Sequence, residues 1–238
     1  MCFSENQSYV NFAILASYGS YLISLSDPNI WRIYVGLIYL SLKDLLQGIL
    51  YRIVKHKDEA MLALGNVPAL LSWMHICFQP LVLAIMASYF SPTYRIGGIK
   101  YWPIALFGLF LFGLFKLTDL DAFDVIKDRP YCTDPASDYC ELNNGAYLGK
   151  YHIGYQFHTK DKFQWIWYAF LIPLIITPSW FIPILLGSFS YIPWYLFSDV
   201  RDGESGAIWC FTVIGCALFV AYFRKTLLQL ARITNFEG

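Results

Sequence analysis

An almost uninterrupted apolar run from Trp31 to Val54 most strongly constrains what this chain can fold into. A helix of about 20 residues, at a rise of about 1.5 Å per residue, crosses the roughly 30 Å hydrocarbon core of a bilayer. Two adjacent charged residues, Lys43 and Asp44, lie in the middle of this run. Each charge costs about 2.5 to 3.5 kcal/mol on insertion scales, so such residues usually face a partner or a water-filled cavity. The pair therefore marks a candidate functional site.

The composition of the whole chain also favours a membrane protein. Of its 238 residues, 57% are hydrophobic and 14% are charged, whereas soluble domains have about 25% charged residues. The 17 basic and 17 acidic side chains balance, and no segment carries the basic stripe that binding to nucleic acid requires. We therefore expect the lipid bilayer, and not nucleic acid, to be the partner of this chain, and we expect no cofactor.

Seven apolar segments are long enough to span a membrane and are separated by polar or proline-bearing stretches. They are residues 8–26, 31–54, 63–90, 99–117, 163–177, 179–198 and 205–223. We therefore predict an all-α fold, a multi-pass integral membrane bundle of about seven transmembrane helices that forms a single domain over residues 1–238. Proline at position 178 divides the fifth span from the sixth; alternatively, residues 163–198 form one bent hairpin that enters from one side. The bundle could act alone, as a homo-oligomer or as a subunit of a larger membrane complex.

One long polar segment, residues 118–162, is predicted to form an extramembrane loop that caps one end of the bundle. Its aspartates lack the glycine turn and the closing glutamate of a calcium-binding loop, so we predict a solvated acidic loop and no metal site. Cys132 and Cys140 lie in this loop, and they could form a local disulfide if the loop faces an oxidising compartment. Basic residues in the short loops favour an outer location for the N-terminus.

Six polar residues recur in the middle of the second and third predicted spans. They are Lys43, Asp44, Gln47, Ser72, His75 and Gln79. The first three lie within about one turn of the second span, and the last three follow the spacing i, i+3 and i+7 on the third span, so each set lies on one helix face. Because lipid cannot hydrogen-bond these groups, we expect both polar faces to point into the bundle.

Three interpretations of this intramembrane polar site remain open. Lys43 and Asp44 could neutralise each other or a neighbour and only determine helix packing, as in a non-catalytic scaffold protein. A proton, ion or small-solute pathway could use Asp44 and His75 as titrating groups and Lys43 as their counter-charge, and this transporter or channel is our leading hypothesis. An intramembrane, lipid-active hydrolase or transferase could use Asp44 and His75 as acid and base or as metal ligands. The sequence has no HxxxH, HExxH or GxSxG motif to support that chemistry.

Several short motifs along the chain resemble those of one known family. The chain begins Met1-Cys2-Phe3-Ser4 and continues with Ser8, has His152-Ile153-Gly154-Tyr155 before the fifth span, and has Ser205-Gly206-Ala207-Ile208-Trp209-Cys210 at the start of the last. In these features it resembles a family of uncharacterised multi-pass membrane proteins, known from bacteria and large DNA viruses, whose members begin Met-Cys-Phe-Ser. The resemblance implies a seven-span membrane fold, and it implies nothing about a reaction type.

The chain departs from the family pattern at the polar site. A Q-Q-x-x-E-G motif in the second span of the family corresponds here to residues 43–48, where Lys43 and Asp44 replace the glutamines and Gln47 replaces the glutamate. The acidic group has therefore moved by about one turn. At the N-terminus, removal of Met1 would leave Cys2 as an aminothiol that could bind a metal or act as a nucleophile. The alternative is that residues 2–8 cap the first helix, and His152 and Tyr155 could likewise only seal a loop.

Overall fold

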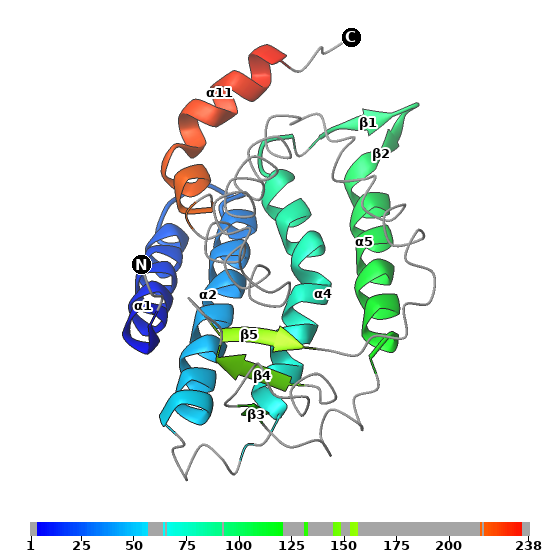
Figure 1. Cartoon of the computed structure of the whole chain (residues 1–238). Coiled ribbons are helices and arrows are strands. Elements are labelled where there is room, and N and C mark those ends of the chain that lie inside the picture. Colours follow the sequence, from blue (N-terminus) through cyan, green and yellow to red (C-terminus); the bar gives the residue numbers. More distant parts are fainter. Residues whose placement is uncertain are drawn as a thin grey trace.

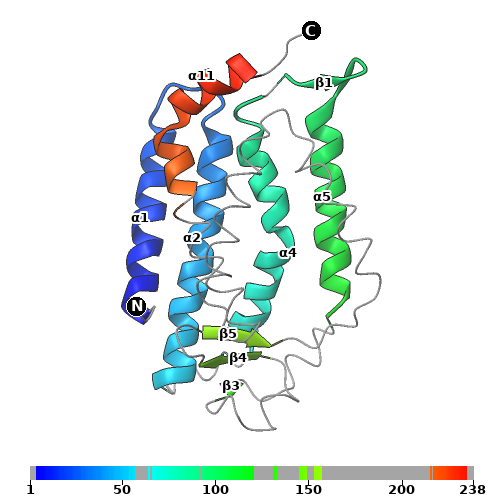
Figure 2. The ribbon, with the colours of Figure 1, turned by 45° about the horizontal axis from the view of Figure 1, so that its top comes forward.

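The structure is a computed structural model, and helices make up most of it. The structure describes residues 4–56, 64, 66–91, 93–120, 131–132, 145–148, 153–156, 215 and 217–234. The four longest helices among the described residues are α1 (Glu5–Ile23), α2 (Trp31–Tyr51), α4 (Val67–Ala87) and α5 (Tyr101–Thr118). A π-helical turn, η1 (Arg52–His56), extends α2. The four helices stand side by side in chain order, each antiparallel to the one before it (Figures 1 and 2).

The ends of these helices follow from the local sequence. Ser4 caps α1, because its Oγ accepts a hydrogen bond of 3.3 Å from the backbone N–H of Gln7. Glu5 in the first turn of α1 places a negative charge at the positive end of the helix dipole. Pro68 lies in the first turn of α4, where its missing N–H has no intrahelical role. Pro80 lies inside α4, and the helix continues past it to Ala87.

Three of the described helices are long enough and apolar enough to cross a membrane. They are Trp31–His56, Val67–Ala87 and Tyr101–Thr118, at the positions of the second, third and fourth predicted spans. These helices are compatible with a membrane protein by their length and composition. The described residues therefore support three spans and not the predicted seven. The predicted spans 163–177 and 179–198 lie outside the described residues, as does most of 205–223.

The helix at the position of the first predicted span, α1, is not one of these three. It has 19 residues, which is a sufficient length, but its first half contains Glu5, Gln7 and Asn11. These polar residues lower its hydropathy below that of a candidate span. The first predicted span is therefore not among the candidate spans of the described residues.

The C-terminal part of the chain contains a helix beyond the last predicted span, which ends at residue 223, and the sequence analysis did not predict this helix. Residues 217–222 are helical, and α11 (Arg224–Thr234) follows directly. Ala217, Val220, Ala221 and Leu227 belong to the main hydrophobic core, together with residues of α1 and α2. Figure 2 shows α11 lying across the ends of α1 and α2. It lies there as an amphipathic helix whose buried face carries Leu227 and whose opposite face is exposed.

Two small sheets correct the prediction of an all-α fold. A hairpin of β1 (Arg95–Ile96) and β2 (Ile99–Lys100) joins α4 to α5. Strands β3 (Tyr131–Cys132), β4 (Gly145–Leu148) and β5 (Ile153–Gln156) form a second sheet in that order within the predicted loop cap. The β4–β5 pair is antiparallel and the β3–β4 pair is parallel. These strands escaped prediction because short strands in a polar segment leave only a weak periodic signal.

The two ends of the bundle differ. At the sheet end, which carries β3–β5, the side chains of Ala146 and Ile153 pack with Leu50 and Ala69, so the sheet covers the adjoining ends of α2 and α4. At the hairpin end, which carries β1, β2 and α11, hydrogen bonds join segments that are distant in sequence. The Arg32 guanidinium donates to the Ser88 carbonyl at 2.5 Å, the Tyr89 hydroxyl to Asp27 Oδ2 at 2.6 Å, and the Trp102 indole to the Ser91 carbonyl at 2.5 Å.

Candidate functional site: buried polar side chains of α1, α2 and α4

All six residues of the predicted intramembrane site are buried. Lys43 is 1% exposed, Asp44 and Gln47 are each 2% exposed, Ser72 is fully buried, His75 is 6% exposed and Gln79 is 2% exposed. Leu42, next to Lys43 in the chain, is 43% exposed. Because neighbouring residues of a helix are about 100° apart around its axis, α2 has an apolar outer face and a polar inner face. The charged pair therefore points into the protein.

A reciprocal contact between Tyr39 and His75 joins α2 to α4. The Tyr39 hydroxyl donates to the His75 backbone carbonyl at 2.5 Å, and the His75 Nε2 lies 2.7 Å from the Tyr39 carbonyl oxygen. Their rings stack with centroids 4.0 Å apart. A carbonyl oxygen can only accept, so Nε2 carries the proton and donates it. In the neutral ring Nδ1 therefore has a free lone pair, and it has no hydrogen-bonding partner in the described part of the chain.

Asp44 has a different partner, on α1. The side chain of Asn11 hydrogen-bonds to the Asp44 carboxylate, and Asn11 Oδ1 accepts a 2.8 Å hydrogen bond from the Nε2 of Gln7. Gln7 is exposed, Asn11 is half-buried and Asp44 is buried. The three side chains thus form a polar connection from the sheet end of α1 to the middle of α2.

Lys43 links these two groups electrostatically. Its charge interacts with Asp44 beside it and also with His75 on α4. Lys43 and Asp44 are about 100° apart around α2, so Lys43 lies on the side of Tyr39 and α4, and Asp44 on the side of α1. The structure therefore places Asp44 and His75 at two interfaces of the same helix, and not in one direct pair.

Several buried polar atoms lack a hydrogen-bonding partner within the described ranges. Six of them belong to the predicted site: Asp44 Oδ2, Gln47 Nε2, Ser72 Oγ, His75 Nδ1, and both Oε1 and Nε2 of Gln79. A buried polar group without a partner costs about 1 to 3 kcal/mol. Native proteins leave few such groups, and ordered water or a bound polar molecule commonly satisfies them. Their concentration on α2 and α4 makes this region suited to hold water, an ion or a polar solute.

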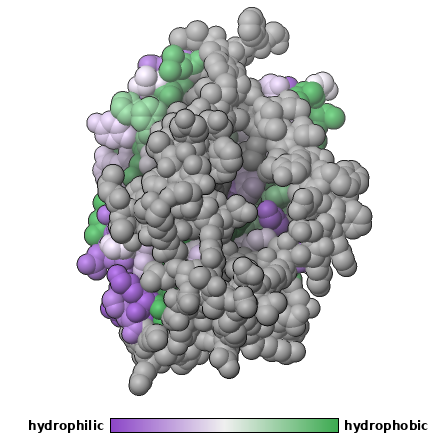
Figure 3. Space-filling model, viewed as in Figure 1, coloured by the Kyte–Doolittle hydropathy of each residue, from purple (hydrophilic) through white to green (hydrophobic). Residues whose placement is uncertain are grey.

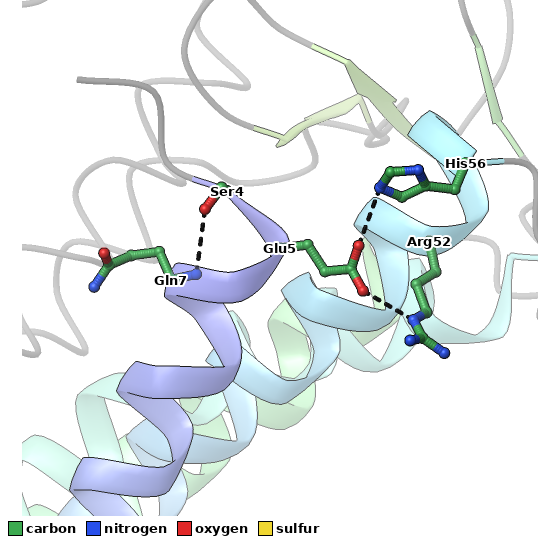
Figure 4. Close-up of polar contacts among 5 residues, drawn as sticks. All are labelled: Ser4, Glu5, Gln7, Arg52 and His56. Carbon is green, nitrogen blue, oxygen red and sulfur yellow. Dashed lines mark hydrogen bonds and ion pairs between the residues drawn. The ribbon is translucent and has the colours of Figure 1, made fainter.

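A charged cluster lies at the sheet end, near the exposed end of the Gln7–Asn11–Asp44 connection. One carboxylate oxygen of Glu5 accepts a 2.8 Å hydrogen bond from Arg52 Nε, and the other oxygen lies 3.0 Å from His56 Nε2 (Figure 4). Arg52 and His56 belong to the π-helical turn η1, so the cluster ties the start of α1 to the end of α2. Gln7 lies on the same turn of α1 as the cluster.

Predicted site residues outside this region are only partly described. Ser4 caps α1, as the capping alternative for the N-terminal motif expected, and Ser8 is 4% exposed. Tyr155 belongs to β5, and Cys132 to β3. The remaining predicted residues, Cys2, Phe3, Cys140, His152, Ser205, Trp209 and Cys210, lie outside the described residues. Among the described residues, no three His, Cys, Asp or Glu side chains are grouped to hold a metal ion.

Sequence reasoning missed Gln7, Asn11 and Tyr39 as parts of the polar region. Gln7 and Asn11 are four residues apart and thus lie on one face of α1, which was a readable signal. Tyr39 precedes Lys43 by four residues and shares its face of α2. An aromatic residue in an apolar helix is usually a packing residue, so the sequence did not indicate that the Tyr39 hydroxyl would hydrogen-bond to α4.

Comparisons with known proteins add a family and no function. Neither the curated proteins nor the solved structures contain a match to this chain. A family model described as a family of unknown function, DUF5765, matches residues 8–228, which include α2, α4, α5 and all six residues of the buried polar site. Since this match covers most of the sequence, the chain belongs to the DUF5765 family of unknown function.

Proposed function

We propose that this protein is a multi-pass integral membrane protein whose buried polar region, between α1, α2 and α4, conducts protons or carries a small cation or polar solute. Three apolar helices of spanning length support the membrane location. On α5 the side chains of Ile104, Phe107 and Phe115 are 61%, 63% and 55% exposed, which suits contact with lipid or with another subunit.

The observation that carries the transport proposal is the set of buried polar atoms without a described partner on α2 and α4. A domain is stable by about 5 to 15 kcal/mol in total, so several unsatisfied groups at about 1 to 3 kcal/mol each are a large cost for packing alone. Water or a polar solute between the helices would satisfy these groups. A hydrated line of polar side chains is also the usual basis of ion and proton pathways in membrane proteins.

The contacts suggest a role for each ionisable residue. Asp44 is connected through Asn11 to the exposed Gln7, so we propose that the site is reached from the sheet end between α1 and α2. His75 offers Nδ1 as the acceptor, since its Nε2 is held by the Tyr39 carbonyl. Lys43 lies within electrostatic range of both; its positive charge complements ionised Asp44 and opposes a positive charge on His75.

Flux across liposomes tests this proposal. Purified full-length protein is reconstituted in liposomes, and proton or cation movement is followed with an entrapped dye after a pH or ion jump. The Asp44→Asn variant keeps the shape of the side chain but removes its charge, and we expect it to lose at least tenfold of the flux. Asp27→Asn, the same change at the hairpin end, should keep it. Absence of flux in the unmodified protein, or equal flux in both variants, would contradict the proposal.

A structural role is the second candidate, and the Tyr39–His75 contact favours it. Reciprocal hydrogen bonds and stacked rings fix the position of α2 against α4, as interhelical polar contacts do in membranes. For a scaffold, replacing both Lys43 and Asp44 with leucine should leave the protein folded as well as before or better. If this double variant is stable and the unmodified protein shows no flux, the scaffold is the better description. An intramembrane enzyme would use the same groups, and its test is bound metal or a reactive Cys2 in the purified protein.

The family match allows this proposal to be extended. Residues 8–228 include all three candidate spans. We therefore propose that other members share a multi-pass membrane fold, and that this family is the one whose members begin Met-Cys-Phe-Ser. Hydropathy of the aligned members at the positions of α2, α4 and α5 tests this extension.

A further inference from the structure

The β1–β2 hairpin combines two basic and two apolar side chains in a fixed arrangement. Its register pairs Arg95 with Lys100 and Ile96 with Ile99. Because successive side chains of a strand point to opposite faces, the two cations lie on one face and the two isoleucines on the other. Gly97 and Gly98 form the turn with φ of 56° and 82°, a conformation that residues with a side chain rarely adopt. The glycines therefore hold this arrangement in place.

The two cations of the hairpin repel each other unless an anion lies near them. Like charges directly opposite on neighbouring strands are destabilising, and neither Arg95 nor Lys100 forms an ion pair with a described acidic side chain. One guanidinium nitrogen of Arg95 donates to the Gly98 carbonyl at 3.0 Å, which leaves its other N–H groups available. Both residues are exposed. This face is thus suited to bind an anion such as a phosphate group.

The apolar face of the hairpin is open and lies at the end of two candidate spans. Ile96 is 49% exposed and Ile99 is 61% exposed. The hairpin connects the end of α4 to the start of α5 and projects beyond the bundle (Figures 1 and 2). Figure 3 shows hydrophilic and hydrophobic residues side by side in its upper right part, where Figure 1 places β1 and β2.

Aromatic residues at the base of the hairpin indicate its depth. Tyr94 and Tyr101 pack edge to face at 5.4 Å, and the Tyr101 N–H donates to the Tyr94 carbonyl. Tyrosine and tryptophan concentrate at the level of the lipid headgroups. The hairpin tip would then lie against the bilayer surface.

The described charges make the hairpin end the positive end of the protein. Its described side chains include the basic residues Arg32, Arg95, Lys100, Arg224 and Lys225 and one acidic residue, Asp27. At the sheet end they include the basic residues Arg52, Lys55 and Lys116 and the acidic residues Glu5 and Asp119. Basic ends of membrane proteins face the cytoplasm, whose leaflet carries anionic lipid. The hairpin therefore lies on the side where its charges have complementary partners.

We propose that the β1–β2 hairpin is a docking site for the phosphate-bearing headgroups of anionic lipids, with Arg95 and Lys100 contacting phosphate and Ile96 and Ile99 entering the border of the acyl chains. This proposal rests on the membrane location proposed above, and it is independent of transport. It also assigns the hairpin end of the bundle to the cytoplasmic side, which leaves the start of α1 on the other side.

Lipid binding to the full-length protein in detergent tests the docking site. Native mass spectrometry counts phosphatidylglycerol and phosphatidylcholine bound to the same protein, and we expect a preference for phosphatidylglycerol. Replacing Arg95 and Lys100 with glutamine should weaken phosphatidylglycerol binding about 30-fold, since each basic residue near an anionic surface contributes about 1 kcal/mol. Binding of phosphatidylcholine should not change. The matched control, Arg52→Gln with Lys55→Gln, removes two basic residues at the sheet end and should keep the preference.

Two further arms separate the sources of binding. Ile96→Ser with Ile99→Ser should weaken the binding of both lipids to a similar extent, because the acyl contact does not depend on headgroup charge. Inorganic phosphate at matched concentration should not displace phosphatidylglycerol. Equal binding of the two lipids, a preference that survives removal of Arg95 and Lys100, or full displacement by inorganic phosphate would each overturn the proposal. Loss of liposome flux with the lipid preference intact would reject only the transport function.

Discussion

Two helices of nearly equal hydropathy, α2 and α5, differ in where their side chains point. In an apolar stretch of 18 residues within α2 and its extension η1, 56% is buried, whereas in α5 the share is 28%. The buried side of α2 carries Lys43, Asp44 and Gln47, and α5 instead exposes large apolar residues such as Ile104 and Phe107. A helix that contacts neighbours on both sides can hold polar groups in the membrane, because its neighbours shield them. A helix at the edge has to be apolar on its outer face.

The same comparison explains the different contacts of the two helices with α4. Between α2 and α4 the contacts include the Tyr39–His75 hydrogen bonds and stacked rings. Between α5 and α4 the described contacts include close apolar packing, in which Gly113 lies against Phe78 and the Cys77 carbonyl. One charged contact also joins these two helices, since the Lys116 ammonium lies 5.7 Å from the centre of the Trp73 ring. Hydrogen bonds are prominent at one interface of α4, and close packing is prominent at the other.

The largest expected effect is a loss of stability at high pH, caused by a contact between the segments that adjoin α4 and α2. Tyr89 lies just beyond α4 and bonds to Asp27, just before α2; burial raises the pKa of Tyr89 to about 12, and Asp27 acts in the same direction. The folded protein thus holds the phenol proton more tightly than the unfolded chain, whose tyrosines titrate near pH 10. This stabilisation is complete below about pH 10 and lost as the pH rises to 12. Two units correspond to about 3 kcal/mol.

Unfolding of the protein in detergent between pH 9 and pH 12 measures this effect. Tyr89→Phe cannot ionise at this position, so it should lose less stability over that range than the unmodified protein. Tyr222→Phe, which changes a tyrosine that is 70% exposed, is the control and should follow the unmodified protein. The same alkaline loss in all three proteins would show that Tyr89 does not couple the two segments.

The second effect concerns the α4–α5 side, where shape decides. A Cβ added at Gly113 would lie 2.4 Å from a Phe78 ring carbon and 3.2 Å from the Cys77 carbonyl oxygen. We expect Gly113→Ala to lower the free energy of unfolding by about 1 to 3 kcal/mol, as overpacking does. Gly108→Ala, on the same helix with no atom within 4 Å of the added Cβ, should be neutral or stabilising by up to about 1 kcal/mol. Equal melting temperatures of the two variants would mean that α5 packs less closely than described.

The smallest expected effect comes from a substitution that makes the buried polar surface of α4 more apolar. Gln79 is buried with neither amide atom bonded to a described residue. Gln79→Leu has a similar volume and removes the unsatisfied groups, so we expect a gain of about 1 kcal/mol in the free energy of unfolding. The same change should reduce liposome flux, because it makes the polar interior more like α5. A loss of stability would instead show that Gln79 has partners, and unchanged flux would separate it from the transport path.

Particular residues show how much of the fold was predictable. The run from Trp31 to Val54 predicted α2 almost to the residue, because a long apolar segment has few alternatives to a helix. Ala146, Tyr147 and Ile153 lie in a sheet that packs on α2, and their short strands gave too weak a pattern to identify. The last predicted span ended at residue 223, directly before α11, but the sequence analysis did not predict the helix that begins at Arg224.

The burial of the six polar residues was predictable from the sequence, and their hydrogen-bonding partners were not. The spacing of Ser72, His75 and Gln79 predicted that they share one face of α4, and all three are buried. Asp44 and His75 were expected to act together as titrating groups, whereas the structure pairs Asp44 with Asn11 and His75 with Tyr39. Such pairings depend on how far each helix is rotated and shifted along its neighbour. A single sequence carries no direct record of those two quantities.

The amino-acid sequence alone determined that this chain has helices long enough to cross a bilayer, that charged residues lie in the middle of one of them, and that these residues are buried. Each of those properties follows from local composition and the energy of transfer into hydrocarbon. Only the tertiary structure decided that Asp44 meets α1, that His75 meets α2, and that α5 keeps an apolar outer face. These are properties of packing, because they arise from the fit of whole helix surfaces against one another.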